Sequence, residues 1–119
     1  MGLAVIPGTL EMLALKAISL GPEHGFGVLQ RIQACSGDVL QVEQGALYPA
    51  LHRLEAQGWV EASWGISDNN RRAKYYAITA AGQQRLSSEA SQWRGLVEAT
   101  SRVLDSLAET GSMATGATR

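Results

Sequence analysis

The chain has 119 residues, a net charge of −1 and one cysteine, and a chain of this length is expected to form one domain with a small core. No apolar run approaches the roughly 20 residues that a membrane-spanning helix needs. A single cysteine excludes an intrachain disulfide bond. We therefore expect a cytoplasmic protein without a secretion leader or membrane anchor.

A first helix is predicted to begin near Thr9, whose hydroxyl can cap it, and to end at Gly21-Pro22. Apolar residues recur along it at spacings of three and four, which is typical of one buried face. These residues are Leu10, Leu13, Ala14, Ala17 and Ile18.

A second helix is predicted from about His24 to Cys35, and its first turn is weakened by Gly25 and Gly27. Phe26, Leu29, Ile32 and Gln33 are expected to share one side of this helix. Cys35 is expected to be a small buried side chain, with a redox role as the alternative.

A third helix is predicted from about Gln44 to Gln57. Its buried face comprises Leu47, Ala50, Leu51 and Leu54, and its outward face comprises Gln44, Gly45, Tyr48, Pro49, His52 and Arg53. Pro49 removes the hydrogen bond to the carbonyl of Gly45. Because Gly45 has no side chain, the pair is interpreted as a tolerated bend near the helix start.

A β-hairpin is predicted next, with strands at Trp59–Trp64 and Arg71–Ile78 and a polar turn between them. From Asn69 to Ser88 the sequence has four basic residues and no acid. The basic residues are Arg71, Arg72, Lys74 and Arg85. Such local positive charge is typical of a surface that binds nucleic acid, although the overall charge is slightly negative.

The last helix is predicted to be capped by Thr79 and to carry an apolar seam at alternating spacings of four and three. The seam comprises Leu86, Ala90, Trp93, Val97, Thr100, Leu104 and Leu107, and Leu96 and Val103 widen it. It is too long for a three-helix core to cover, so a second copy of the chain is the expected cover. Apart from the polar Thr100 and from Val103, these residues form the predicted dimer interface.

The order of these elements predicts a mainly α fold with a two-stranded β-wing, a winged helix-turn-helix followed by a long helix. We expect a DNA-binding domain at residues 1–79, a dimerisation helix at 80–109 and a flexible tail at 110–119.

The chain resembles the PadR-like family of bacterial transcriptional regulators, in the short-chain group with a single C-terminal helix. The resemblance is carried by GTLEMLALKAI, HGFGVLQRI, QGALYPALHRLEAQGWV, RRAKYYAITAAG and the long C-terminal helix. It implies a homodimer whose long helices pair and whose recognition helices and wings bind double-stranded DNA. It also implies a repressor, since many members release DNA when a small aromatic molecule or a cellular signal binds.

Two positions depart from the family's pattern. Phe26 replaces a tyrosine that is common in the second helix, so a hydroxyl contact to DNA is lost there. Asn69-Asn70 stands where the wing often has glycine, and because asparagine tolerates left-handed turns, we expect the hairpin to survive.

The candidate DNA-binding residues lie on the outward face of the third helix and on the wing. They are Gln44, Gly45, Tyr48, His52, Arg53, Asn70, Arg71, Arg72 and Lys74. Alternatives in which these residues do not contact DNA stay open. The wing can be a solvated strand pair, His52 an exposed side chain without a role, and Arg53 the partner of an acidic residue in its own domain. Tyr75 and Tyr76 are expected to pack rather than to stack on a ligand.

Trp93 and Val97 are the candidate ligand-binding residues. Two indoles near a dimer axis are hard to pack without a gap, which a flat aromatic effector would fill. The alternative is that Trp93 only packs in the seam. A pseudo-palindromic operator is expected from the two-fold symmetry of a dimer.

An enzyme is the competing class, and the sequence gives it little support. It has no nucleophile motif, phosphate-binding loop or metal-ligand spacing, and only His24 and His52 could serve as general bases. We therefore expect no catalytic activity, metal or cofactor. The remaining alternative is a protein-interaction adaptor whose winged helix does not bind DNA.

Overall fold

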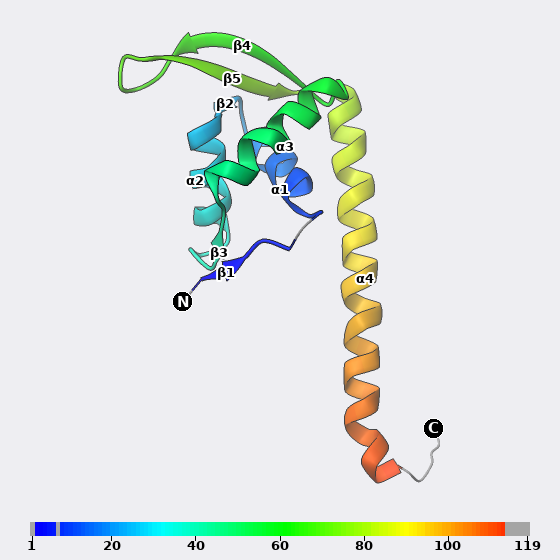
Figure 1. Cartoon of the computed structure of the whole chain (residues 1–119). Helices are drawn as coiled ribbons and strands as arrows, with labels where there is room; N and C mark the ends of the chain where they lie inside the picture. The colour runs from blue at the N-terminus through cyan, green and yellow to red at the C-terminus, as the bar shows by residue number, and fades with distance from the viewer. Residues whose placement is uncertain (1, 7, 114–119) are drawn as a thin grey trace. The chain divides into compact units, whose positions relative to one another are not determined.

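The computed structural model describes residues 2–6 and 8–113, with side chains as far as Ser106. Its elements follow the predicted order, with three short strands in addition (Figure 1). In chain order they are β1 Leu3–Ala4, α1 Leu10–Ser19, β2 Glu23–His24, α2 Gly25–Cys35, β3 Leu40–Gln41, α3 Gln44–Ala56, β4 Val60–Ile66, β5 Arg72–Ile78 and α4 Ala80–Met113. The chain divides into two compact units between Ser87 and Ser88.

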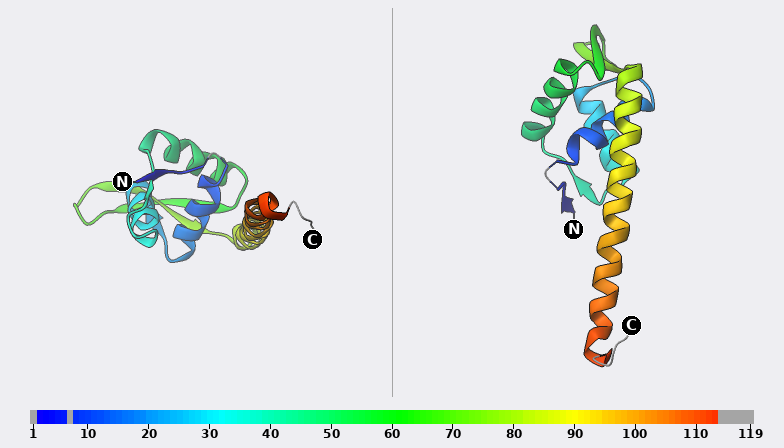
Figure 2. Two further views of the ribbon diagram at one scale, coloured as in Figure 1. Left: turned by 90° about the horizontal axis from the view of Figure 1, so that it is seen from below. Right: turned by 90° about the vertical axis from the view of Figure 1, so that its right-hand side faces the viewer.

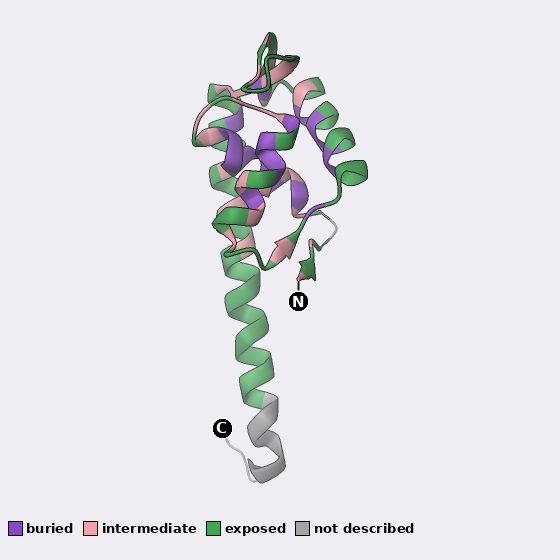
Figure 3. Cartoon of the chain, turned by 90° about the vertical axis from the view of Figure 1, so that its left-hand side faces the viewer, coloured by how far each residue is buried: buried purple, intermediate pink, exposed green. Residues whose placement is uncertain are grey.

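The N-terminal unit packs α1, α2 and α3 together (Figure 2), and their buried residues form one hydrophobic core (Figure 3). The predicted buried face of α3 is confirmed, because Leu47, Ala50, Leu51 and Leu54 are all fully buried. On α1, Leu15 joins the predicted face as a fully buried residue, whereas Leu13 is only partly buried.

The buried face of α2 only partly coincides with the side that Phe26, Leu29, Ile32 and Gln33 share. Val28, Leu29 and Ile32 are buried, but Phe26 is 46% exposed and Gln33 is only partly buried. Phe26 lies two residues before Val28, so the helix turns its ring away from the core. Cys35 is also exposed rather than buried, because it ends α2 beyond Ile32, the last buried residue of this helix.

The wing belongs to an antiparallel sheet of three strands in the order β2-β5-β4, one strand more than predicted. In the added strand, Glu23 pairs with Tyr76 and His24 with Tyr75. The β4–β5 hairpin extends beyond the three helices (Figures 1 and 2). Its turn closes through the Ser67 amide, which donates to the Arg71 carbonyl at 2.8 Å.

Two further predictions about local structure are confirmed. Asn70 adopts a left-handed conformation with φ of 60°, so asparagine supports the turn where glycine was expected. Thr79 caps α4, because its hydroxyl oxygen accepts a hydrogen bond from the Gly82 amide at 3.0 Å. The same hydroxyl donates to the Gly58 carbonyl at 2.7 Å.

The first turns of α4 belong to the N-terminal unit. A Cβ atom at Gly82 would overlap the carbonyl oxygen of Trp59, so only glycine fits there without a backbone shift. Leu86 packs against the N-terminal core. Its own chain therefore covers part of this side chain, and its predicted place in a dimer seam stays a prediction.

In the C-terminal unit, α4 exposes most of the predicted seam. Leu96, Val97, Val103 and Leu104 are exposed, whereas Ala90 and Trp93 are partly buried. The helix continues to Met113, past the end expected at residue 109. The side chain of Leu107 and the tail at 114–119 lie outside the described residues. No described helix is long and apolar enough to cross a bilayer.

Candidate nucleic-acid interface

A hollow of about 600 Å³ lies in the N-terminal unit among the start of α2, the middle of α3 and the hairpin. We call it the wing groove. It is lined by His24, Gly25, Phe26, Gln30, Tyr48, Trp64, Ser67, Asp68, Asn69, Arg71, Arg72, Ala73, Lys74 and Tyr76. Aromatic and basic side chains predominate, with Asp68 as the one acid among them.

The alternation of strand residues explains why the hairpin presents these side chains. The cross-strand pairs Val60–Ile78, Ala62–Tyr76, Trp64–Lys74 and Ile66–Arg72 share one face of the sheet. Near the helices this face packs on the core, where Val60 and Tyr76 are buried. Farther along the hairpin it passes the edge of the core, so Trp64 is 60% and Ile66 64% exposed. The same face of the sheet therefore packs on the core near the helices and lines the wing groove farther along the hairpin.

Two of the predicted DNA-binding cations already have partners in the chain. The Arg53 Nε atom lies 2.6 Å from Glu11 Oε2, so the alternative of an ion pair within the domain is confirmed. The Lys74 Nζ atom lies 3.0 Å from Glu55 Oε1 on α3. This hydrogen bond raises the pKa of Lys74 above its ordinary value of 10.5. Both residues can contribute less to DNA binding than free cations would.

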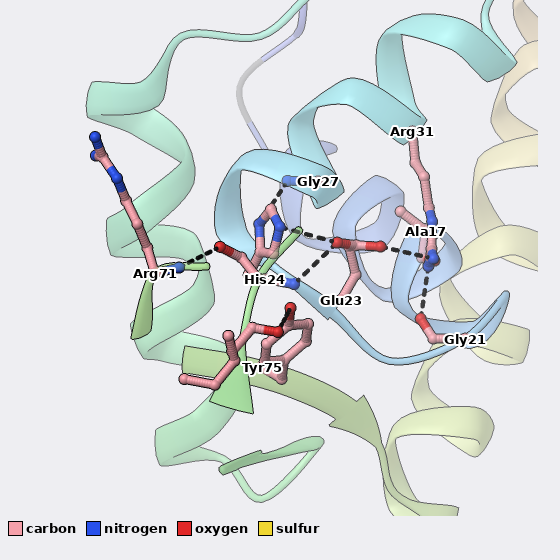
Figure 4. Close-up of polar contacts among 10 residues, drawn as sticks. Ala17, Gly21, Glu23, His24, Gly27, Arg31, Arg71 and Tyr75 are labelled. Carbon is pink, nitrogen blue, oxygen red and sulfur yellow. Dashed lines mark hydrogen bonds and ion pairs between the residues drawn. The ribbon is translucent and has the colours of Figure 1, made fainter. Parts of the chain in front are cut away.

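Arg71 and Arg72 are differently placed. In the described part of the chain no carboxylate lies within ion-pair distance of either guanidinium. Arg71 is exposed, and its side chain points away from the other labelled residues in Figure 4. The Arg72 guanidinium lies 4.5 Å from the centroid of the Trp64 ring. The hairpin therefore carries two exposed positive charges without an acidic partner.

The exposed face of α3 is as predicted. Gln44, Gly45, Tyr48 and His52 are all exposed. A Cβ atom at Gly25 would overlap the Tyr48 ring, so the start of α2 lies directly against this ring and limits its position. From the sequence, Gly25 is predicted only to weaken the first turn of the helix, and no local signal indicates this contact.

A polar network behind the groove joins α1, β2, α2 and β5 (Figure 4). His24 caps α2, because its Nδ1 atom accepts a hydrogen bond from the Gly27 amide at 3.1 Å, and its ring lies edge-on to Tyr75. Glu23 lies 3.4 Å from His24 Nε2 and 2.8 Å from Arg31 Nη2. Arg31 also donates to the carbonyls of Ala17 and Gly21. These charged groups hold the framework of the site together.

The two tyrosines of β5 pack, as expected. Tyr76 is buried, and this burial raises its pKa above the ordinary value of 10.0. The Tyr75 hydroxyl donates to the Ile66 carbonyl at 3.2 Å, which braces the two strands of the hairpin. Among the residues that the structure describes, no cluster of three His, Cys, Asp or Glu side chains could hold a metal ion.

Trp93 and Val97 lie together on α4 in the C-terminal unit. They line a shallow hollow along one side of that helix with Arg94 and Glu98. Their predicted role in ligand binding depends on a second copy of the chain and stays a prediction.

Comparison with known proteins identifies the family. Residues 14–88 match the family described as transcriptional regulator PadR-like. An uncharacterized protein of Lysinibacillus sphaericus is 32% identical over 95 residues, which cover 79% of this chain and 86% of that protein.

Two solved structures are similar to this one. The first is a PadR family transcriptional regulator from Eggerthella lenta, with 31% identity, a TM-score of 0.69 and 82% of each chain covered. The second is a PadR-like transcriptional regulator from Bacillus cereus, with 28% identity, a TM-score of 0.65, and 82% of this chain and 91% of that chain covered. The predicted winged fold is confirmed, and so is the prediction against an enzyme, since these relatives are regulators. The chain belongs to the PadR-like family of transcriptional regulators.

Proposed function

We propose that the chain is a sequence-specific DNA-binding repressor that acts as a homodimer and responds to a small aromatic effector. The observation that carries DNA binding is the pair of exposed guanidinium groups, Arg71 and Arg72, beside the exposed face of α3. A regulator that reads DNA needs a helix for the base edges and cations for the phosphates. The wing groove brings both together.

The proposed contacts divide between the two elements. The exposed face of α3 enters the major groove, where Gln44 and His52 can hydrogen-bond to base edges and Tyr48 to a phosphate. Arg71 and Arg72 bind phosphates or enter the minor groove. Asn70 keeps the turn that presents them.

The homodimer is proposed from the C-terminal unit. Leu96, Val97, Val103 and Leu104 are exposed along α4, and large apolar side chains exposed at a regular spacing are typical of a protein interface. A second copy of α4 would cover these residues. The proposed organisation is thus a DNA-binding unit at residues 1–79, joined by the first turns of α4, and a dimerisation segment in the rest of that helix.

The effector site is proposed between the two copies of Trp93, with Val97 beside it. A ligand that prefers one spacing of the two subunits shifts the dimer towards that spacing. A coupling free energy of about 1–3 kcal/mol would then change operator affinity roughly 5- to 150-fold.

The test is a fluorescence anisotropy titration of DNA from upstream of the gene, repeated at several salt concentrations. The double variant Arg71→Ala, Arg72→Ala should bind less tightly at every salt concentration. Its plot of log affinity against log salt should flatten by up to about two charges per subunit. Lys16→Ala is the matched control, since it removes an exposed cation of α1 that does not line the wing groove.

Two outcomes would argue against the proposal in different ways. If the double variant binds like the parent at every salt concentration, the wing does not contact DNA. If the parent shows no salt-dependent binding to any DNA, the chain is better explained as a protein-interaction adaptor.

A further inference from the structure

We infer that Trp64 is a positioning residue for Arg72, whose guanidinium it holds ready for a DNA phosphate. The inference rests on the proposed DNA binding and assigns a role to an exposed indole. Trp64 contributes little to the core, since 60% of it is exposed. The Arg72 guanidinium lies over the ring of Trp64.

The register of the hairpin brings the two side chains together. Trp64 pairs with Lys74, and Ile66 pairs with Arg72. Trp64 and Arg72 are therefore diagonal neighbours on the same face of the sheet, within reach for an aromatic and a long side chain. The guanidinium carbon lies 4.5 Å from the centroid of the ring, inside the range of a cation–π contact.

The kind of contact matters for DNA binding. A guanidinium that stacks on a ring uses its flat face, and the N–H donors at its edge stay free. Lys74 differs, because its ammonium group donates to the Glu55 carboxylate. Of these two cations on the inner face of the hairpin, Arg72 is held in place with its donors still available for a phosphate.

Holding Arg72 in place should increase affinity. A long side chain that is mobile in the free protein loses conformational entropy when it binds, and a side chain that is already ordered loses less. From the strength of exposed cation–π contacts, we expect loss of the ring to weaken binding about two- to five-fold per subunit. The charge of Arg72 is unchanged, so the salt dependence should change less than in Arg72→Ala.

The test is a double-mutant cycle read by anisotropy. Trp64→Leu removes the ring and Trp64→Phe keeps an aromatic face, and each is made with Arg72 and with Arg72→Ala. We expect Trp64→Leu to weaken DNA binding and Trp64→Phe to keep most of the parent's affinity. In the Arg72→Ala background, neither substitution of Trp64 should change the affinity. Thermal unfolding of each variant confirms that the hairpin is folded.

Arg72→Lys supplies a second route if Trp64→Leu fails to fold, because lysine keeps the charge without the planar face. We expect it to bind as weakly as Trp64→Leu. Three results overturn the inference and leave DNA binding intact: Trp64→Leu binds like the parent, its effect persists without Arg72, or Arg72→Lys binds like the parent. The second of these would mean that the indole contacts DNA itself. A parent that does not bind DNA overturns the proposed function and this inference together.

Discussion

The two units of this chain use the same apolar periodicity in different ways. In the N-terminal unit the apolar faces of three helices cover one another, so Leu15, Leu47 and Leu54 are fully buried. In the C-terminal unit the apolar residues of α4 recur just as regularly, yet Leu104 is 65% exposed. A periodic apolar face therefore indicates that something covers it, without telling whether the cover is the same chain or a second copy.

The largest effect is expected from a charge in the exposed part of the seam. Leu104→Glu would bury an unpaired carboxylate in the proposed dimer, at a cost of several kcal/mol. The dimer dissociation constant should rise at least about 100-fold, as measured by sedimentation velocity. The N-terminal unit has its own core, so its far-UV signal should persist.

Leu86→Ala is the matched control, because Leu86 follows the same spacing but packs on the N-terminal core. It should lower the free energy of unfolding by about 1–2 kcal/mol and leave the dimer intact. A stable dimer of the Leu104→Glu variant would contradict the proposed interface.

A smaller effect is expected from two glycines of the same helix, one in each unit. Gly82→Ala would force its Cβ atom into the carbonyl of Trp59, so the free energy of unfolding should fall by about 1–3 kcal/mol. Gly95→Ala meets no atom within 4 Å in one chain and should stabilise the helix by up to about 1 kcal/mol. Urea denaturation measures both. If the two substitutions changed the free energy of unfolding equally, the close packing at Gly82 would not restrict the helix.

The smallest effect is confined to alkaline pH and to the N-terminal unit. Burial raises the pKa of Tyr76 above 10.0, so the unfolded chain releases this proton first. The stabilising contribution is complete below pH 10 and is lost as the pH rises through the folded-state pKa. As the pH rises above 10, the free energy of unfolding of Tyr76→Phe should therefore fall less than that of the parent, each relative to its own value at neutral pH. Residues 88–119 contain no tyrosine or lysine, so alkaline sedimentation should show dimer until the N-terminal unit unfolds. Identical pH profiles for the two proteins would rule out this role for Tyr76.

Much of the fold could be predicted because its signals are local. The cap at Thr79, the buried face of α3 and the hairpin each follow from a few neighbouring residues. The predicted cap at Thr9 is wrong, because the Thr9 hydroxyl donates to the Ile6 carbonyl at 2.7 Å and makes no cap to α1. β2 could not be predicted, since two residues show no alternation and pair only because α2 starts beside β5. The exposure of Phe26 could not be predicted either, because it depends on how α2 packs against α1 and α3.

The candidate site was predictable in its residue types more than in its contacts. Exposure of Tyr48 and His52 followed from helical periodicity. The ion pairs of Arg53 and Lys74 could not be predicted from local spacing. Glu11 is 42 residues from Arg53 in the sequence, and Glu55 is 19 residues from Lys74. The approach of Gly25 to Tyr48 is a tertiary contact that no spacing rule indicates. The contact of Arg72 with Trp64 depends on the exact register of the hairpin, which the sequence alone does not fix.

The internal ion pairs also bear on how a regulator finds its target in a cell. Arg31, Arg53 and Lys74 are each bound to a carboxylate of the same chain. Affinity for random DNA grows with the number of phosphates that a protein neutralises, and a chromosome offers about a million or more competing sites. A protein with many free cations would spend most of its time on the wrong sequences. Because these three cations are paired with carboxylates of the same chain, fewer charges would bind random DNA, and a larger fraction of the protein would be free for its operator. A small number of molecules per cell would then be enough to fill a single operator.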